Sequence, residues 1–156
     1  MTQTITAWHF FGDTLRDGTP VPPDGVWLKH KGPLVICESG FHASREPFDA
    51  LKYAPGNNLA MVKCRGIGEE QSDKFVCSER MIVKRMDATE MLRYFARMQA
   101  LSVVHLWDAP DVVLDYLATG DERIRATARA AAWAAAWDAA VGDFNALITE
   151  AFGEYL

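Results

Sequence analysis

The spacing of apolar residues changes near residue 87, and this change limits the folds open to the chain. Upstream of it, short apolar runs are separated by Gly- and Pro-rich turns, a pattern typical of β-strands. These runs predict five strands, at residues 5–11, 25–30, 33–37, 59–64 and 80–85. Apolar residues at helical spacing predict one short helix over 46–53, before the fourth strand.

Downstream of residue 87 the apolar spacing is helical. Asp87 opens a capping-box pattern and predicts the start of a first helix. Pro110 and Gly120 stand at the two ends of a second helix, where proline and glycine are common. Asp121 predicts the start of a long last helix, and Gly142 predicts a break or kink within it because glycine weakens helix interiors.

The two patterns together predict an α+β fold, with an antiparallel-rich sheet followed by a helical C-terminal half. The length of 156 residues suits one compact domain. We therefore expect a single domain over 1–156, with a sheet-rich part at 1–86 and a helical part at 87–156.

Composition narrows the function classes. The net charge of −5 argues against direct binding of nucleic acid through a broad basic surface. The three cysteines form no CxxC pair and the four histidines share no metal-ligand spacing, so we expect reduced thiols and no metal site. Neither a signal peptide nor a membrane span is predicted, and we expect a cytoplasmic protein.

Several unusual strings occur in an order that resembles a family of small phage and prophage proteins. They are "AWHF", "GPLVICESGFHAS", "DALKYAPG", "LSVVHLWDAPDVVLDYLATGDE" and the Ala/Trp-rich "AAAWAAAWDAA". The resemblance covers nearly the whole chain. It implies an intracellular phage-type protein and implies no reaction.

The stretch "GFHASREPFDALKYAPGNNLAMVKCRG" is similar to the central motif of ADP-ribosyltransferases of the poly(ADP-ribose) polymerase type. The strings "AWHFFGD" and "SERMIVKRMDATEMLRYF" are similar to the strands that carry that family's His and catalytic Glu. The resemblance implies a His9, Tyr53 and Glu79 set and NAD as a candidate cofactor. This sequence departs from the family where Phe10 follows the His, because a Gly is usual there.

Each residue of that set has a chemical reason. Glu79 would hold a ribose hydroxyl and stabilise an oxocarbenium-like centre. Tyr53 would stack on the nicotinamide ring and His9 would bond the adenosine ribose. The neighbouring strand would form a cleft wall, with these candidate ligand-binding residues: Gly40, Phe41, His42 and Ser44. Each of these side chains also fits an ordinary structural place on a strand, turn or helix end.

Acidic residues gather at two places in the sequence. Glu69 and Glu70 stand in the stretch 68–74, which we expect to be a loop, and Asp111 and Asp115 stand near a helix start. These residues could dock on a basic partner surface, since complementary charge guides association. Solvation and the helix dipole explain the same charges without a partner.

Trp133 and Trp137 lie one helical turn apart in the last helix, on a pattern continued by other apolar residues. The other residues of that pattern are Val141, Phe144, Ile148, Phe152 and Tyr155. Two readings remain open: the tryptophans pack in the chain's own core, or their face binds a partner or a second copy.

We expect the chain to act in phage–host conflict by binding a host protein or ribonucleoprotein complex, as an anti-CRISPR-type inhibitor would. The alternative is an ADP-ribosyltransferase-like enzyme or a nucleotide-binding domain that uses the cleft. A third class is a structural role, with homo-oligomers formed through the C-terminal helix.

Overall fold

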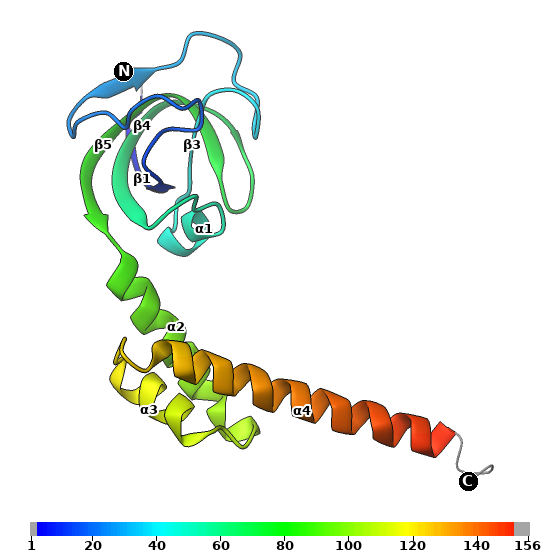
Figure 1. The fold of residues 1–156 in the computed structure, drawn as a ribbon. Helices are drawn as coiled ribbons and strands as arrows, with labels where there is room; N and C mark the ends of the chain where they lie inside the picture. The colour runs from blue at the N-terminus through cyan, green and yellow to red at the C-terminus, as the bar shows by residue number, and fades with distance from the viewer. Residues whose placement is uncertain (1–2, 152–156) are drawn as a thin grey trace. The chain divides into compact units, whose positions relative to one another are not determined.

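The computed structural model describes residues 3–151, with side chains described through residue 147. The chain divides into two compact units, Met1–Leu92 and Arg93–Leu156 (Figure 1). The first unit carries the sheet and the second is helical. The α+β fold class with an antiparallel sheet and a C-terminal helix is therefore confirmed. The division falls close to residue 87, where the apolar spacing changes.

The first unit contains five antiparallel strands and one short helix. The strands are β1 (Ile5–Phe11), β2 (Trp27–Lys29), β3 (Phe41–Ala43), β4 (Asn58–Glu70) and β5 (Phe75–Asp87), and the helix is α1 (Pro47–Leu51). The order β1-β4-β5-β2 defines the sheet, and β3 pairs with another part of β5. The long β4–β5 hairpin is therefore the centre of the sheet.

The sheet curls until its two ends meet (Figure 1). The backbone N–H of Trp8 on β1 donates to the carbonyl of Ser44 at 2.8 Å, and the N–H of Ser44 donates back at 2.9 Å. Ser44 directly follows β3, so this bridge joins the β3 end of the sheet to β1. The result is a small, nearly closed barrel.

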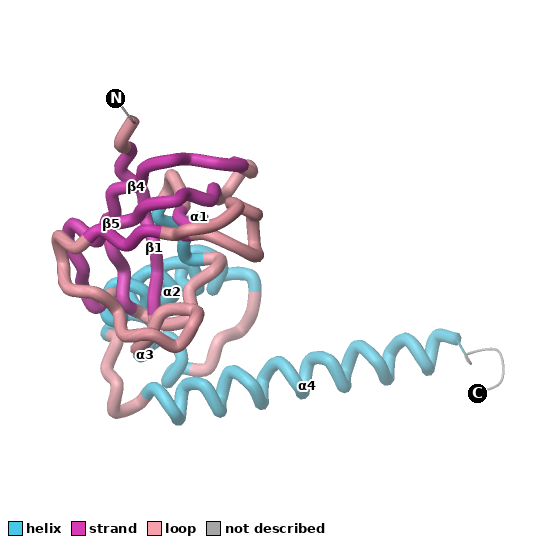
Figure 2. Tube along the Cα trace, turned by 90° about the horizontal axis from the view of Figure 1, so that it is seen from above, coloured by secondary structure: helices cyan, strands magenta, loops and turns pink. Residues whose placement is uncertain are grey.

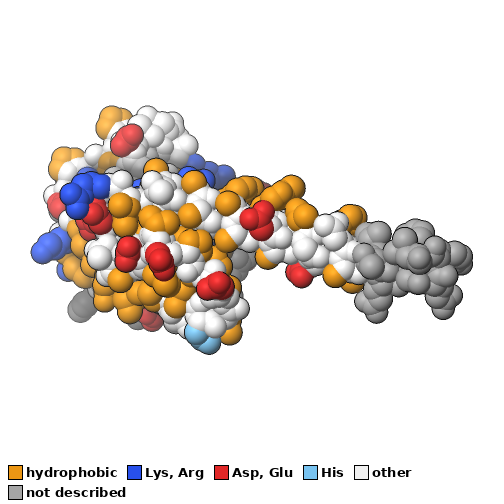
Figure 3. All heavy atoms as spheres, turned by 60° about the horizontal axis from the view of Figure 1, so that its bottom comes forward, with side chains coloured by type: hydrophobic (Ala, Val, Ile, Leu, Met, Phe, Trp, Pro, Cys, Tyr) orange, Lys and Arg blue, Asp and Glu red, His pale blue; other side chains and the backbone are white. Residues whose placement is uncertain are grey.

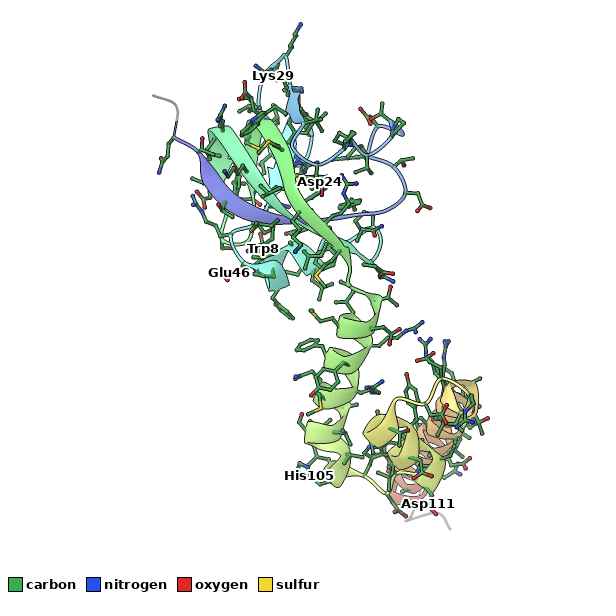
Figure 4. The ribbon with its side chains drawn as sticks, turned by 90° about the vertical axis from the view of Figure 1, so that its left-hand side faces the viewer. Trp8, Asp24, Lys29, Glu46, His105 and Asp111 are labelled. Atoms are coloured by element: carbon green, nitrogen blue, oxygen red, sulfur yellow. The ribbon has the colours of Figure 1, made fainter. Side chains whose placement is uncertain are left out.

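Strand alternation places one set of side chains inside this barrel. Its core includes Ala7, Val62, Phe75 and Ile82, each at most 5% exposed. A second, smaller cluster lies where α1 packs against β1, around Phe10, Ala50 and Ala88. Figure 4 shows this side of the sheet, with Trp8 on β1 and Glu46 at the start of α1 labelled.

The strand predicted at 33–37 is wrong. In its place the chain forms a tight turn, in which the N–H of Val35 donates to the carbonyl of Ser39 at 2.9 Å. Cys37 occupies the left-handed region of backbone space there, with φ of 69°. The third strand is Phe41–Ala43 instead, because the turn reverses the chain before it can pair with β5.

The acidic stretch at 68–74, predicted as a loop, contains the last three residues of β4 and the turn over 71–74 that joins the two strands. β4 continues through Glu70 and β5 begins at Phe75. Apolar content predicted both strands too short, because their backbone hydrogen bonds continue through polar residues on either side of the apolar runs. Each strand is 13 residues long.

The second unit contains most of α2 (Thr89–Val103), a 3-10 turn η1 (Val104–Leu106), α3 (Asp111–Thr119) and α4 (Arg125–Ala151). Gly120 ends α3 in the left-handed conformation, as its position predicts. The predicted break at Gly142 is wrong, because α4 runs through it (Figure 2). In the described chain, no helix is both long and apolar enough to span a membrane.

Trp133 and Trp137 are exposed, at 76% and 64% of their surface. The reading in which both tryptophans fill the chain's own core is therefore wrong for this unit. Val141, Phe144 and Leu147 are exposed beside them. The side chains of Ile148, Phe152 and Tyr155, which continue the sequence pattern, lie outside the described ones.

Gly40 is expected to be irreplaceable for the stability of the first unit. Its φ of 107° disfavours any side chain, and an added Cβ would lie 2.6 Å from Val76 and 2.8 Å from Leu34. Gly40→Ala should lower the free energy of unfolding by about 2–4 kcal/mol, from backbone strain plus overpacking. Gly18→Ala is the matched control, because Gly18 has φ of 81° and open space around it. Denaturant titrations that give equal losses for the two variants would contradict the packing argument.

Candidate functional site

His42 lies at the centre of a group of polar side chains at one end of the barrel. It stands on β3 opposite Val76 of β5. The N–H of Cys37, in the preceding tight turn, donates to Nε2 of His42 at 2.8 Å. This bond fixes Nε2 as an acceptor and ties the turn to the strand.

Arg80 lies beneath His42 and is only 6% exposed. Its Nη1 donates to the backbone carbonyl of His42 at 2.6 Å, and its guanidinium lies 5.3 Å from the ring centre of Phe41. Arg80 pairs in register with Cys64, a core residue, so it occupies an inward-facing position of β5. The barrel therefore holds a buried positive charge.

Two further cations stand near His42. Nη1 of Arg16 donates to the carbonyl of Cys37 at 2.7 Å. Lys74, in the β4–β5 turn, places its Nζ 4.3 Å from the ring centre of Tyr53. We call Arg16, Lys74 and Arg80 the cationic cluster. Within the described residues, none of the three makes an ion pair with a carboxylate.

Burial and the charges of the cluster together lower the pKa of the two nearby histidines. Burial lowers the pKa of His42 below its ordinary value, and the charges of Arg16, Arg80 and Lys74 lower it further. His9 shares the inward face of β1 with Ala7 and Phe11, and its ring stacks near that of Phe11. Burial, followed by the charges of Arg80 and His42, holds the pKa of His9 well below 6.5.

Cys64 and Cys77 form a hydrogen-bonded thiol pair in the barrel core beside Arg80. Both are completely buried. This hydrogen bond and burial raise the pKa of Cys64, and the same bond, followed by Arg80, lowers the pKa of Cys77. If either thiol ionises, Cys77 does so first, because it accepts the bond and faces the guanidinium.

The structure does not bring His9, Tyr53 and Glu79 together. Glu79 lies 3.4 Å from Nζ of Lys29 and 4.0 Å from Nη1 of Arg65. It directly precedes the inward-facing Arg80, so alternation places it on the outer face of the sheet, away from His9. Lys29, labelled in Figure 4, extends from β2 on the outside of the sheet.

Tyr53 lies beside the β4–β5 turn, away from Glu79. It is about half exposed, and its hydroxyl donates to Asp73 at 2.7 Å. Lys74 from the same turn lies over its ring. The charge of Lys74 also lowers the pKa of His42, so Lys74 links Tyr53 to His42 rather than to His9 or Glu79.

Of the other predicted ligand-binding residues, the structure gives Gly40, Phe41 and Ser44 packing surroundings. Gly40 lies against Val76, and Phe41 packs on the barrel core. Ser44 is buried and its backbone closes the barrel. His42 is the member of that group whose polar side chain lies among several cations, while Phe41 meets Arg80 through its ring.

The acidic residues predicted to contact a partner differ in whether they are already paired within the chain. Both oxygens of Glu70 accept bonds from Arg45, at 2.7 and 2.8 Å, so this carboxylate is already paired within the chain. Glu69 is exposed on β4. Asp111 and Asp115 are exposed on α3, and Figure 4 labels Asp111 at its start.

Sequence reasoning missed the cationic cluster. Arg80 carried a usable signal, because in the run at 80–85 it shares one strand face with Ile82, which is buried. A charged residue at such a position indicates a buried charge. Arg16 and Lys74 carried no such signal, since both stand in turns whose folding brings them to His42. Among the described residues, no group of His, Cys, Asp and Glu side chains could hold a metal ion.

The first unit is thus a small, nearly closed antiparallel barrel with a cationic end. The chain belongs to the family described as a domain of unknown function, DUF7666, whose model matches residues 5–94. That match spans β1 to β5 and the first turns of α2. No curated protein and no solved structure matches the chain.

The lowered pKa of His9 predicts how stability depends on pH. A histidine that resists protonation in the fold contributes stability that is complete above 6.5, its ordinary pKa. That contribution is lost as the pH falls below 6.5 toward the pKa of the folded protein. The free energy of unfolding should therefore fall between about pH 7 and 5, by about 1.4 kcal/mol for each tenfold difference in proton affinity.

The variant His9→Gln should flatten this slope, while His105→Gln, at an exposed position of the second unit, should leave it unchanged. Urea titrations of the wild type and both variants across this pH range measure the slopes. Equal slopes for the wild type and His9→Gln would show that His9 does not titrate with folding.

Proposed function

We propose that this chain is a phage-type protein that acts in phage–host conflict by binding a host protein complex, and that it does so without catalysis. The proposal is supported by the exposed acidic residues of α3, by an exposed apolar face on α4 that suits a second copy of the chain, and by the strings that resemble phage proteins. Host cytosol is the compartment that this role requires.

The apolar face consists of Trp133, Trp137, Val141 and Phe144, which we call the α4 stripe. Each of the four is between 41% and 76% exposed. Figure 3 shows hydrophobic side chains following α4 along its length. Scattered exposed apolar residues are ordinary, but aligned aromatic side chains on one helix face indicate a binding surface.

The spacing along the α4 stripe is four, four and three residues, so Phe144 repeats Trp133 after one period of 11. A period of 11 residues corresponds to 3.67 residues per turn, slightly more than a straight helix has. Helices with this repeat pair along a nearly straight or right-handed seam. The stripe is therefore suited to a second helix lying along it.

We assign the α4 stripe to a second copy of this chain. Aromatic side chains bury about 150–250 Å² each, so the three aromatics of two copies reach roughly 1,000 Å², the lower end of a specific interface. The sequence of α4 contains two basic and three acidic residues, Arg125, Arg129, Asp138, Asp143 and Glu150, for a net charge of −1. Two copies therefore meet with little net repulsion between their helices.

A dimer presents its acidic surfaces twice. The second unit holds nine acidic and five basic residues in sequence positions 93–156, so 5 − 9 gives a net charge of −4. Asp111 and Asp115 on α3 are exposed members of this set, and Glu69 on β4 is a separate exposed carboxylate of the first unit. Two linked copies of a weak contact bind more tightly than one, which suits a protein that occupies a host complex.

The ADP-ribosyltransferase alternative gains no support from the geometry. Glu79 and His9 lie on opposite faces of the sheet, and Tyr53 stands at the β4–β5 turn. A transferase needs these three groups around one nicotinamide–ribose bond.

The double variant Trp133→Ala/Trp137→Ala should be monomeric while the wild type is dimeric, because it removes half of the α4 stripe. Both side chains are exposed, so within one copy their loss should cost less than about 0.5 kcal/mol. Sedimentation equilibrium gives the mass, and circular dichroism gives the helix content. Leu106→Ala, at an exposed residue of η1 off the stripe, is the control and should remain dimeric. A monomeric wild type would contradict the assignment to a second copy.

Expression of the chain should restore the plating of a phage that a CRISPR-type interference system restricts. Asp111→Asn/Asp115→Asn should reduce this restoration, because it removes exposed charge from the host-binding surface. Asp138→Asn on α4 controls for loss of charge alone, and Glu79→Gln tests the enzymatic alternative; both should act like the wild type. Failure of the wild type to restore plating contradicts the counter-defence proposal, and loss of activity in Glu79→Gln alone would favour the enzyme.

A further inference from the structure

We propose that the cationic cluster around His42 binds the phosphate group of a small molecule. The site is built by three separated parts of the chain: Arg16 in the loop after β1, the turn at 37–42, and Lys74 with Arg80 at and near the start of β5. It is independent of the α4 stripe and of the proposed host contact.

The first support is the absence of compensating charge. Several other basic residues of this unit have carboxylate partners: Arg45 pairs with Glu70, Arg85 with Asp24, and Lys52 with Asp49. The cationic cluster has none within the described residues. The charged groups that act on His42 are all cations. Like charges held together raise the free energy of a fold unless an anion joins them.

The second support is the burial of Arg80. A guanidinium that is 6% exposed normally has a carboxylate or an equivalent anion beside it. Its bond to the carbonyl of His42 uses one of five N–H donors. The anionisable groups near the cluster are thiols and a phenol rather than carboxylates: Cys64 and Cys77 lie in the core beside Arg80, and Lys74 hydrogen-bonds the exposed thiol of Cys37 and the hydroxyl of Tyr53.

The chemistry of the cluster favours phosphate over a carboxylate. Two arginines and one lysine present more positive charge than a single carboxylate would balance, and a phosphate monoester is close to a dianion at neutral pH. Arginine donors match tetrahedral phosphate oxygens well, and lysine adds a point charge. The exposed ring of Tyr53 beneath Lys74 offers an apolar face beside the charges. The cations would bind the phosphate group of a nucleoside monophosphate and of free phosphate alike. Only the nucleotide has a base that could stack on Tyr53.

The experiment titrates the full-length protein with inorganic phosphate, and separately with adenosine monophosphate. Chloride holds the ionic strength constant, so that screening stays the same. The ring signals of His42 and His9 are followed by NMR. A bound anion should raise the pKa of both rings, since it opposes the cations that lower it, and the signals should saturate.

The double variant Arg16→Gln/Lys74→Gln should lose about tenfold or more in affinity, since it removes two charge-assisted contacts. Lys63→Gln/Lys84→Gln is the matched control, because both lysines are exposed on strands away from His42 and the variant loses the same charge. It should bind like the wild type. Circular dichroism confirms that both variants fold.

Saturation by both probes at equal affinity identifies the phosphate group alone as the ligand. Tighter binding of the nucleotide, lost in Tyr53→Ala, identifies a nucleotide. No shift of the histidine signals with either probe overturns the proposal. Equal loss of affinity in the two charge-matched double variants also overturns it, because binding would then reflect net charge.

Discussion

The pairing of β4 with β5 is the constraint on which the first unit depends. These two strands pair from Asn58–Asp87 to Glu70–Phe75, and every other strand attaches to one of them. β1 lies along β4, while β2 and β3 take different parts of β5. A short helix and a tight turn then bring β3 close enough to β1 for the Trp8–Ser44 bridge to close the barrel. Both edges of the hairpin are thus covered, which removes the exposed edges that favour aggregation.

A barrel this small has little interior volume, so each buried polar group has a large effect on its neighbours. Several interior side chains are small, such as Ala7, Ala60 and Val62, which leaves room for the long side chain of Arg80. Its guanidinium donates to the β3 backbone at His42 and, after burial, is the next cause of the lowered pKa of His9. A single buried charge thereby connects β1, β3 and β5 electrostatically. Burying the charge of Arg80 costs desolvation free energy, so its position is better explained by an interaction with an anion than by packing alone.

The sequence predicted the fold where local pattern decides structure. The class, the short helix near 46–53 and the glycine end of α3 follow from spacing and turn chemistry. The strand at 33–37 failed because apolar content cannot distinguish a strand from a turn that packs its apolar residues. The candidate set around His9 failed to assemble because alternation puts Glu79 and His9 on opposite faces, which depends on strand register. The cationic cluster was missed because its members meet only through tertiary folding.

The second unit has a different balance between burial and exposure. Among its described residues only Val113 and Ala128 are buried, whereas the α4 stripe is exposed. Isolated helices are marginal in water, and most helical stability in proteins comes from burying one face. α3 packs against α4, but Ala128 is the one buried residue among the described side chains of α4, so most of the described helix lacks that support within one copy. Covering the stripe with a second copy would supply the burial that α4 lacks, so assembly and helix stability become coupled. Under this proposal the interface would stabilise the helices of the second unit, whereas the first unit buries its own core.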